Sequence, residues 1–143
     1  MFLGEFVHTI DDKGRLTIPA RFRDDLEGGL VVTRGIDRCL AIYPMKAWKR
    51  LAKKVSALPM TDRSARAFRR LVFANASDFI PDKQGRVLIP PRLREYASLN
   101  GEVVVTGLNT YIELWNPDSW GEERGRVEGE DDVDAEAWAA LGI

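Results

Sequence analysis

The sequence predicts a mainly β fold with helices, of the α+β class, in which two copies of one short β module interlock into a single pseudo-dimeric barrel. Three observations lead to this prediction. The chain of 143 residues contains an internal repeat, and each copy reads as four short strands joined by glycine-containing turns. Each copy also spans only about 44 residues, which is close to the lower limit for independent folding. Interlocking would pair the strand edges that a single module leaves open.

The repeat is clearest in a block of thirteen residues. Residues 11–23 (DDKGRLTIPARFR) align with residues 82–94 (DKQGRVLIPPRLR), and seven positions are identical, where chance gives roughly one. With one inserted residue the match continues through these pairs: Gly35 with Gly107, Leu40 with Ile112, Tyr43 with Trp115 and Trp48 with Trp120.

Both copies predict the same order of elements. A strand enters a tight turn in which Gly14 or Gly85 supplies a left-handed residue. A second strand follows, Pro19 or Pro90 opens a short helix, and a hairpin completes the copy. The expected strands are residues 5–10, 15–18, 30–33 and 39–43 in the first copy and 77–80, 86–89, 102–106 and 111–115 in the second.

The segment between the copies predicts two helices. Pro44–Ala57 repeats apolar residues at helical spacing, and Thr61 is the expected N-cap of the second helix. The acidic tail either forms a last short helix, Asp134–Leu141, or stays mobile. The predicted division is therefore a first module at 5–47, a helical linker at 48–75, a second module at 76–119 and a tail at 121–143.

Composition excludes several classes of protein. Hydrophobic residues make up 45% of the chain, which is typical of a globular protein. No apolar run approaches the roughly 18 residues that a membrane span needs, and an acid at Glu5 argues against a signal peptide. We therefore expect a cytoplasmic protein. The single Cys39 and single His8 cannot form a disulfide or a zinc site between them, so we expect no metal, no cofactor and no enzyme activity.

Charge is unevenly distributed along the chain. From Glu122 onward there are eight acidic and two basic residues, which leaves 19 basic and 14 acidic residues before that point. The body thus carries a net charge of +5 and the tail −6, although the whole chain sums to −1. A basic body with an acidic tail is compatible with binding to nucleic acid.

The two turns carry residue types that suit a DNA contact. Arg15 and Arg86 each begin a strand, and a planar guanidinium can bond O6 and N7 of guanine together. Lys13 and Lys83 can pair with phosphates. We therefore predict that both turns bind DNA.

The remaining turn residues would support that contact. Gly14 and Gly85 keep the turns thin, whereas Asp11 and Asp82 would repel phosphate if they pointed at it. We expect each aspartate to accept turn N–H groups or to orient the arginine four residues on. The alternative is a solvated hairpin with a local Asp–Arg pair, since one D-x-x-x-R is a weak signal. Its recurrence within the repeat is a stronger one.

Basic residues of the linker form a rival surface that could follow phosphates, although we favour a solvated helix face. Its members are Lys46, Lys49, Arg50, Lys53, Lys54, Arg63, Arg66, Arg69 and Arg70. Four further arginines recur on the two short helices, where they could assist at phosphates or bridge to acids: Arg21, Arg23, Arg92 and Arg94.

Four segments together resemble the MraZ family: residues 1–5 (MFLGE), 12–19 (DKGRLTIP), 65–70 (ARAFRR) and 84–90 (QGRVLIP). The similarity runs from Met1 to about Trp120. It implies two SpoVT–AbrB-type swapped-hairpin modules in one double-split β-barrel, and assembly into a homo-oligomeric ring. It also implies a regulator of the division and cell-wall gene cluster, including its own promoter, that binds short direct repeats in double-stranded DNA.

The family's D-x-x-x-R residues map onto Asp11 with Arg15 and onto Asp82 with Arg86. In the second turn Lys83 comes one place earlier and Gln84 takes the matching site, so the two halves are expected to contact DNA unequally. The location that this implies is the cytoplasm, at the nucleoid, with no membrane and no small-molecule substrate.

Two other functions remain open. An antitoxin-like regulator of the same fold would bind a protein partner through the tail, where Trp138, Leu141 and Ile143 lie among acids. A hydrolase or metal enzyme is the third possibility. Against it, the sequence contains no paired-carboxylate or nucleophile motif.

Overall fold

The computed structural model describes residues 1–128 and 137–142. Within these residues no helix is long and apolar enough to cross a membrane. Eight strands form one sheet in the order β5-β3-β4-β8-β7-β1-β2-β6. They are β1 (Phe2–Ile10), β2 (Arg15–Thr17), β3 (Leu30–Arg34), β4 (Leu40–Pro44), β5 (Ser77–Phe79), β6 (Arg86–Leu88), β7 (Gly101–Asn109) and β8 (Ile112–Trp115). The helices are η1 (Ala20–Phe22), α1 (Arg23–Leu26), α2 (Met45–Ser56), α3 (Arg63–Ala74), α4 (Pro91–Ala97) and α5 (Pro117–Glu128).

The two halves of the chain alternate in the sheet. Strand β1 pairs with β7 over nine residues, from Phe2 opposite Asn109 to Ile10 opposite Gly101. Strand β5, the counterpart of β1, pairs with β3, while β2 pairs with β6 and β4 with β8. All these pairs are antiparallel and join one half to the other. The two edge strands, β5 and β6, are joined by a turn in which the Asp82 N–H donates to the Arg86 carbonyl at 3.0 Å. The sheet is therefore a nearly closed barrel. The pairing of strands between the halves confirms the predicted interlocked fold.

Both halves contribute to one core. Phe22 and Leu93 occupy equivalent positions on the short helices, and both are buried in the same cluster. The Phe22 ring meets the rings of Phe2 and Phe6 edge-on, with centroids 5.3 Å apart in each pair. Neither half could keep this core without the other, because buried residues of both halves pack into the same cluster.

The hairpins differ from the sequence alignment in one respect. Arg34 lies opposite Leu40, whereas Gly107 lies opposite Ile112. Gly107 is therefore the counterpart of Arg34, and its alignment with Gly35 was wrong by one residue. The glycine at 107 has its own cause, since a Cβ there would lie 2.5 Å from the backbone of Phe2 on β1.

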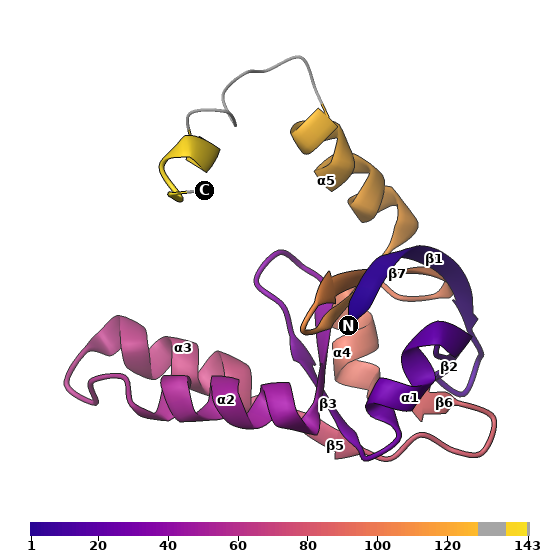
Figure 1. Cartoon of the computed structure of the whole chain (residues 1–143), viewed down its shortest axis with the longest axis horizontal. Coiled ribbons are helices and arrows are strands. Elements are labelled where there is room, and N and C mark those ends of the chain that lie inside the picture. Colours follow the sequence, from indigo (N-terminus) through magenta and orange to yellow (C-terminus); the bar gives the residue numbers. More distant parts are fainter. Residues whose placement is uncertain (129–136, 143) are drawn as a thin grey trace.

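Helices α2 and α3 form a hairpin that projects from the barrel, here called the linker hairpin (residues 45–74) (Figure 1). The N-cap of α3 is Asp62, whose carboxylate accepts the Ser64 N–H at 3.1 Å, so the prediction of Thr61 was wrong by one residue. Arg69 closes the other helix by donating from Nη2 to carbonyls at its end, those of Val55, Ser56 and Leu58.

Helix α5 was not predicted: its first residues fell in the predicted second module (76–119) and its residues from 121 onward in the predicted tail (121–143). Trp120 stacks at a tilt on Trp115, with ring centroids 5.5 Å apart, and donates from Nε1 to Glu5 at 2.6 Å. Arg124 also donates to Glu5, at 2.9 Å. These contacts hold α5 against β1 and β8. Of the predicted helix Asp134–Leu141, residues 134–136 lie outside the described residues, whereas residues 137–139 form a short helical turn.

Candidate nucleic-acid interface

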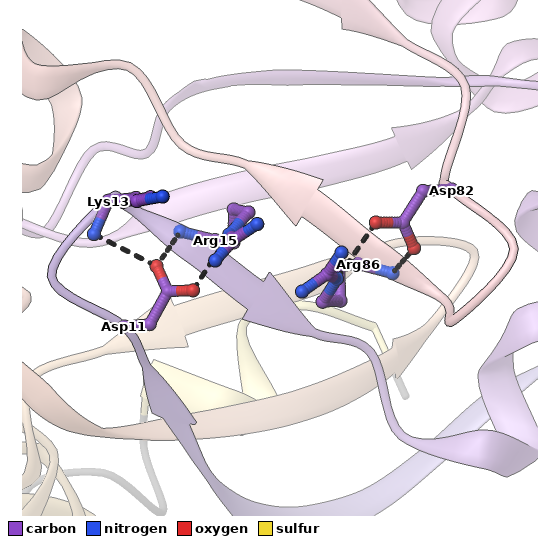
Figure 2. A network of polar contacts seen from close by, with 5 residues as sticks. All are labelled: Asp11, Lys13, Arg15, Asp82 and Arg86. Atoms are coloured by element: carbon purple, nitrogen blue, oxygen red, sulfur yellow. Dashed lines mark hydrogen bonds and ion pairs between the residues drawn. The ribbon is translucent and has the colours of Figure 1, made fainter.

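The turn between β1 and β2 is built around one carboxylate. Asp11 accepts the backbone N–H groups of Lys13 at 3.0 Å and Arg15 at 2.8 Å, and its second oxygen accepts Arg15 Nε at 2.8 Å (Figure 2). The Gly14 N–H donates to the Asp11 carbonyl at 2.9 Å, with Gly14 at φ +84°. The aspartate thus both closes the turn and orients the arginine, as expected from the sequence.

The turn between β5 and β6 repeats this geometry. Asp82 accepts the N–H groups of Gln84 and Arg86, both at 2.9 Å, and Arg86 Nε at 2.8 Å. The Gly85 N–H donates to the Asp82 carbonyl at 2.9 Å. Gln84 occupies the place of Lys13, so Lys83 lies where the first turn has Asp12. The two turns therefore have the same backbone hydrogen bonds but differ in the position of their lysine.

The two arginines lie on one face of a two-stranded ribbon. In the β2–β6 register Arg15 is opposite Leu88, Leu16 opposite Val87, and Thr17 opposite Arg86. Because side chains alternate along a strand, Arg15 and Arg86 share the outer face, while Leu16 and Val87 enter the core. Figure 2 shows the two arginines on neighbouring strands, between the two aspartates. Their Nη atoms make no hydrogen bond to any residue of 1–128 or 137–142.

Hydrogen bonding lowers the pKa of Asp11 and of Asp82, chiefly through the backbone N–H groups of Arg15 and Arg86. A lower pKa in the folded chain means that each carboxylate stabilises the fold above the unfolded-state pKa of about 3.9. That stabilisation is lost as pH falls through the folded-state pKa. We therefore expect the difference in unfolding free energy between the wild type and an Asp11→Asn, Asp82→Asn variant to narrow as pH is lowered from 7 to 3. Urea titrations at each pH measure it, and a difference that widens on acidification would contradict the assignment.

The glycines are covered by arginines of the opposite half. A Cβ at Gly14 would lie 2.7 Å from Arg94 Cζ, and a Cβ at Gly85 would lie 2.5 Å from Arg23 Nε. Both glycines are buried, although the sequence suggested that their role is to thin the turn toward DNA.

Alanine at these two glycines is expected to destabilise the fold. The positive φ and the overlap with arginine each oppose a Cβ, so we expect Gly14→Ala or Gly85→Ala to cost about 1–3 kcal/mol in urea unfolding. Gly28 is the control, because nothing lies within 4 Å of a Cβ at that position. Equal midpoints for Gly14→Ala and Gly28→Ala would refute this explanation.

Two further residues of the outer face were missed in the sequence, Thr17 and Leu88. Leu88 is 48% exposed between the arginines, and an apolar group there could contact a thymine methyl. The alternation of inward and outward side chains along these short strands was the sequence signal that could have identified them. Thr17 and Leu88 occupy equivalent positions in the two copies but differ in residue type, so they add to the difference between the halves.

The rival basic surface lies elsewhere. Figure 1 shows the linker hairpin and the two turns at opposite ends of the molecule. Some of its cations serve the hairpin itself: Arg69 closes α2, and Arg66 Nη1 donates to the Met60 carbonyl at 2.9 Å.

In the described ranges no three acidic, histidine or cysteine side chains gather as a metal site would require.

A family model described as "MraZ protein, putative antitoxin-like" matches residues 1–71 and again residues 72–128. The chain belongs to the MraZ family. The two adjacent matches show that MraZ architecture here is two tandem domains, in agreement with the repeat. Transcriptional regulator MraZ of Thermomicrobium roseum is 52% identical over 141 residues, 99% of each chain. The protein of that name from Herpetosiphon aurantiacus is 50% identical over all 143 residues, and that from Roseiflexus castenholzii is 53% identical over 84% of each chain.

Proposed function

We propose that this chain is a sequence-specific DNA-binding transcription regulator that reads double-stranded DNA with the β2–β6 ribbon. The observation that carries the proposal is the pair of aspartate-held arginines, Arg15 and Arg86, on one exposed face. The relatives' shared name, transcriptional regulator, supports the same function. In this proposal the protein is not an enzyme, uses no cofactor, and acts in the cytoplasm at the nucleoid.

The ribbon suits the major groove, which admits two antiparallel strands. Each guanidinium is held through Nε by its aspartate, so its Nη groups can donate to O6 and N7 of a guanine. Holding the side chain before binding lowers the conformational entropy that is lost on contact. Lys13 and Lys83, which are exposed beside the arginines, would bind the flanking phosphates.

The target that we propose is a set of short direct repeats upstream of the division and cell-wall gene cluster, including the chain's own promoter. One ribbon makes few contacts, so its affinity for a single repeat is low. A homo-oligomeric ring would present several ribbons and raise affinity through effective concentration. The spacing of the repeats would then match the spacing of the subunits. Residues 5–47 and 76–119 are the proposed DNA-binding modules, joined by the linker at 48–75 and followed by the tail at 121–143.

A salt series tests the proposal directly. The purified chain is titrated with a duplex from upstream of its own gene and with a shuffled duplex of equal composition. We expect preference for the natural duplex and an affinity that falls with salt, with a log–log slope of about −0.9 per phosphate contacted. Equal affinity for both duplexes at every salt concentration would overturn sequence-specific binding.

A second candidate function is an antitoxin-like regulator whose tail binds a protein partner. The description of the matching family model as antitoxin-like favours it. Because α5 packs on Glu5, the informative truncation ends at Glu128 and keeps that helix. A partner that co-purifies with the full chain and not with this truncation would support the candidate, and equal recovery from both would oppose it.

A further inference from the structure

Two arginines without an assigned role, Arg23 and Arg94, each lie against the turn of the opposite half. Arg94 follows β6 in the chain but covers Gly14 of the first turn, and Arg23 follows β2 but covers Gly85 of the second. An alanine in place of either glycine would place its Cβ within 3.0 Å of guanidinium atoms. The contacts are therefore close, and they cross between the halves.

Hydrogen bonds complete each crossed contact. The Ile89 N–H donates to the Gly14 carbonyl at 2.8 Å, and Arg94 Nε donates to the Ile89 carbonyl at 3.0 Å. The second turn has the same arrangement. There the Ile18 N–H donates to the Gly85 carbonyl at 2.9 Å, and Arg23 Nε donates to the Ile18 carbonyl at 3.0 Å. Each glycine is thus bound on its carbonyl and covered on its Cα by one short segment of the opposite half.

Pairing with acids does not account for the positions of these two arginines. Neither Arg23 nor Arg94 forms an ion pair with a carboxylate of the residues that the structure describes. Each guanidinium lies so close to its glycine that a Cβ there would overlap it, so the arginine in this position requires the glycine. This dependence explains why both recur in the repeat, and the sequence alone could not show that they meet across the halves.

We infer that Arg94 is a positioning residue for the Asp11–Arg15 turn and that Arg23 is one for the Asp82–Arg86 turn. Each turn is completed by the half that does not contain it. The inference rests on the proposed function for its effect on DNA, whereas the crossed support itself is a property of the free protein.

The crossed support can be measured without DNA. In protein labelled with ¹⁵N-glycine, Arg94→Ala is expected to shift the amide signal of Gly14 and to leave that of Gly85 nearly in place. Arg23→Ala is expected to do the reverse. Arg21→Ala and Arg92→Ala are matched controls, because they remove the same charge from exposed sites two residues earlier. Equal shifts at both glycines, or shifts confined to the variant's own half, would overturn the inference.

Binding measurements then test the effect on DNA at low salt. Arg94→Ala is expected to weaken binding roughly 3- to 100-fold in an Arg86→Ala background and hardly at all in an Arg15→Ala background. Arg94→Lys keeps the charge without the flat group, so we expect it not to restore affinity. Restoration by lysine, or equal losses in both backgrounds, would overturn the positioning role.

Two further outcomes are distinguishable. If the wild type shows no preference for the natural duplex while the glycine signals shift in the crossed pattern, the proposed function fails and the crossed support stands. If Arg94→Ala does not fold, Arg94→Lys is used for the glycine signals, with a smaller shift expected at Gly14 and again none at Gly85.

Discussion

Replacing Arg15 and Arg86 together with alanine is expected to abolish sequence-specific DNA binding without unfolding the protein. A guanidinium that reads a base contributes about 1–3 kcal/mol at each site, and the losses multiply when several copies bind together. The side chains are 36% and 29% exposed, and each pairs with one aspartate. Exposed pairs of this kind contribute about 0–1 kcal/mol to folding, so the cost to stability is small.

Fluorescence anisotropy with a labelled duplex measures this effect, and size-exclusion chromatography confirms that assembly is unchanged. The matched control is Lys49→Ala with Lys53→Ala, which removes two exposed charges from the linker hairpin. We expect the control to lower affinity modestly through the loss of general charge. A larger loss in the control than in the turn variant would assign DNA binding to the hairpin.

Replacing Phe22 with alanine is expected to lower the free energy of unfolding by about 3–5 kcal/mol. Phe22 is 1% exposed and packs edge-on against Phe2 and Phe6 of β1, the strand that pairs with β7 of the other half. The loss is therefore felt by both halves, and we expect the variant and the wild type each to unfold in one transition.

Urea unfolding at one fixed protein concentration, followed by tryptophan fluorescence and by circular dichroism, tests this prediction. Ile36→Ala is the control, because Ile36 is 76% exposed, and we expect a change within about 0.5 kcal/mol. Two separate transitions, one for each half, would contradict a shared core.

The architecture could be predicted because its main signal is a repeat. The glycine, the proline and the Asp–Arg spacing recur at one offset, and each has a local physical cause, so the turns and short helices followed directly. The need to cover strand edges predicted that the copies interlock. The placement of Gly107 could not be predicted in this way, because its cause is the close approach of β1, a contact between opposite ends of the chain.

Long-range contacts also explain what the sequence did not show. Helix α5 contains two glycines and many acids, which locally indicate a tail. It is held by Glu5, 115 residues from Trp120. The crossed arginines Arg23 and Arg94 are the same kind of case. Their recurrence was visible, but which turn each one supports depends on how the halves interleave.

The structure of the protein bound to a duplex carrying its own upstream repeats tests the central claim most directly. We predict that the guanidinium groups of Arg15 and Arg86 lie within hydrogen-bonding distance of base edges, with Asp11 and Asp82 still bound to Nε. A duplex bound along the linker hairpin, with both turns turned away from it, would contradict the claim.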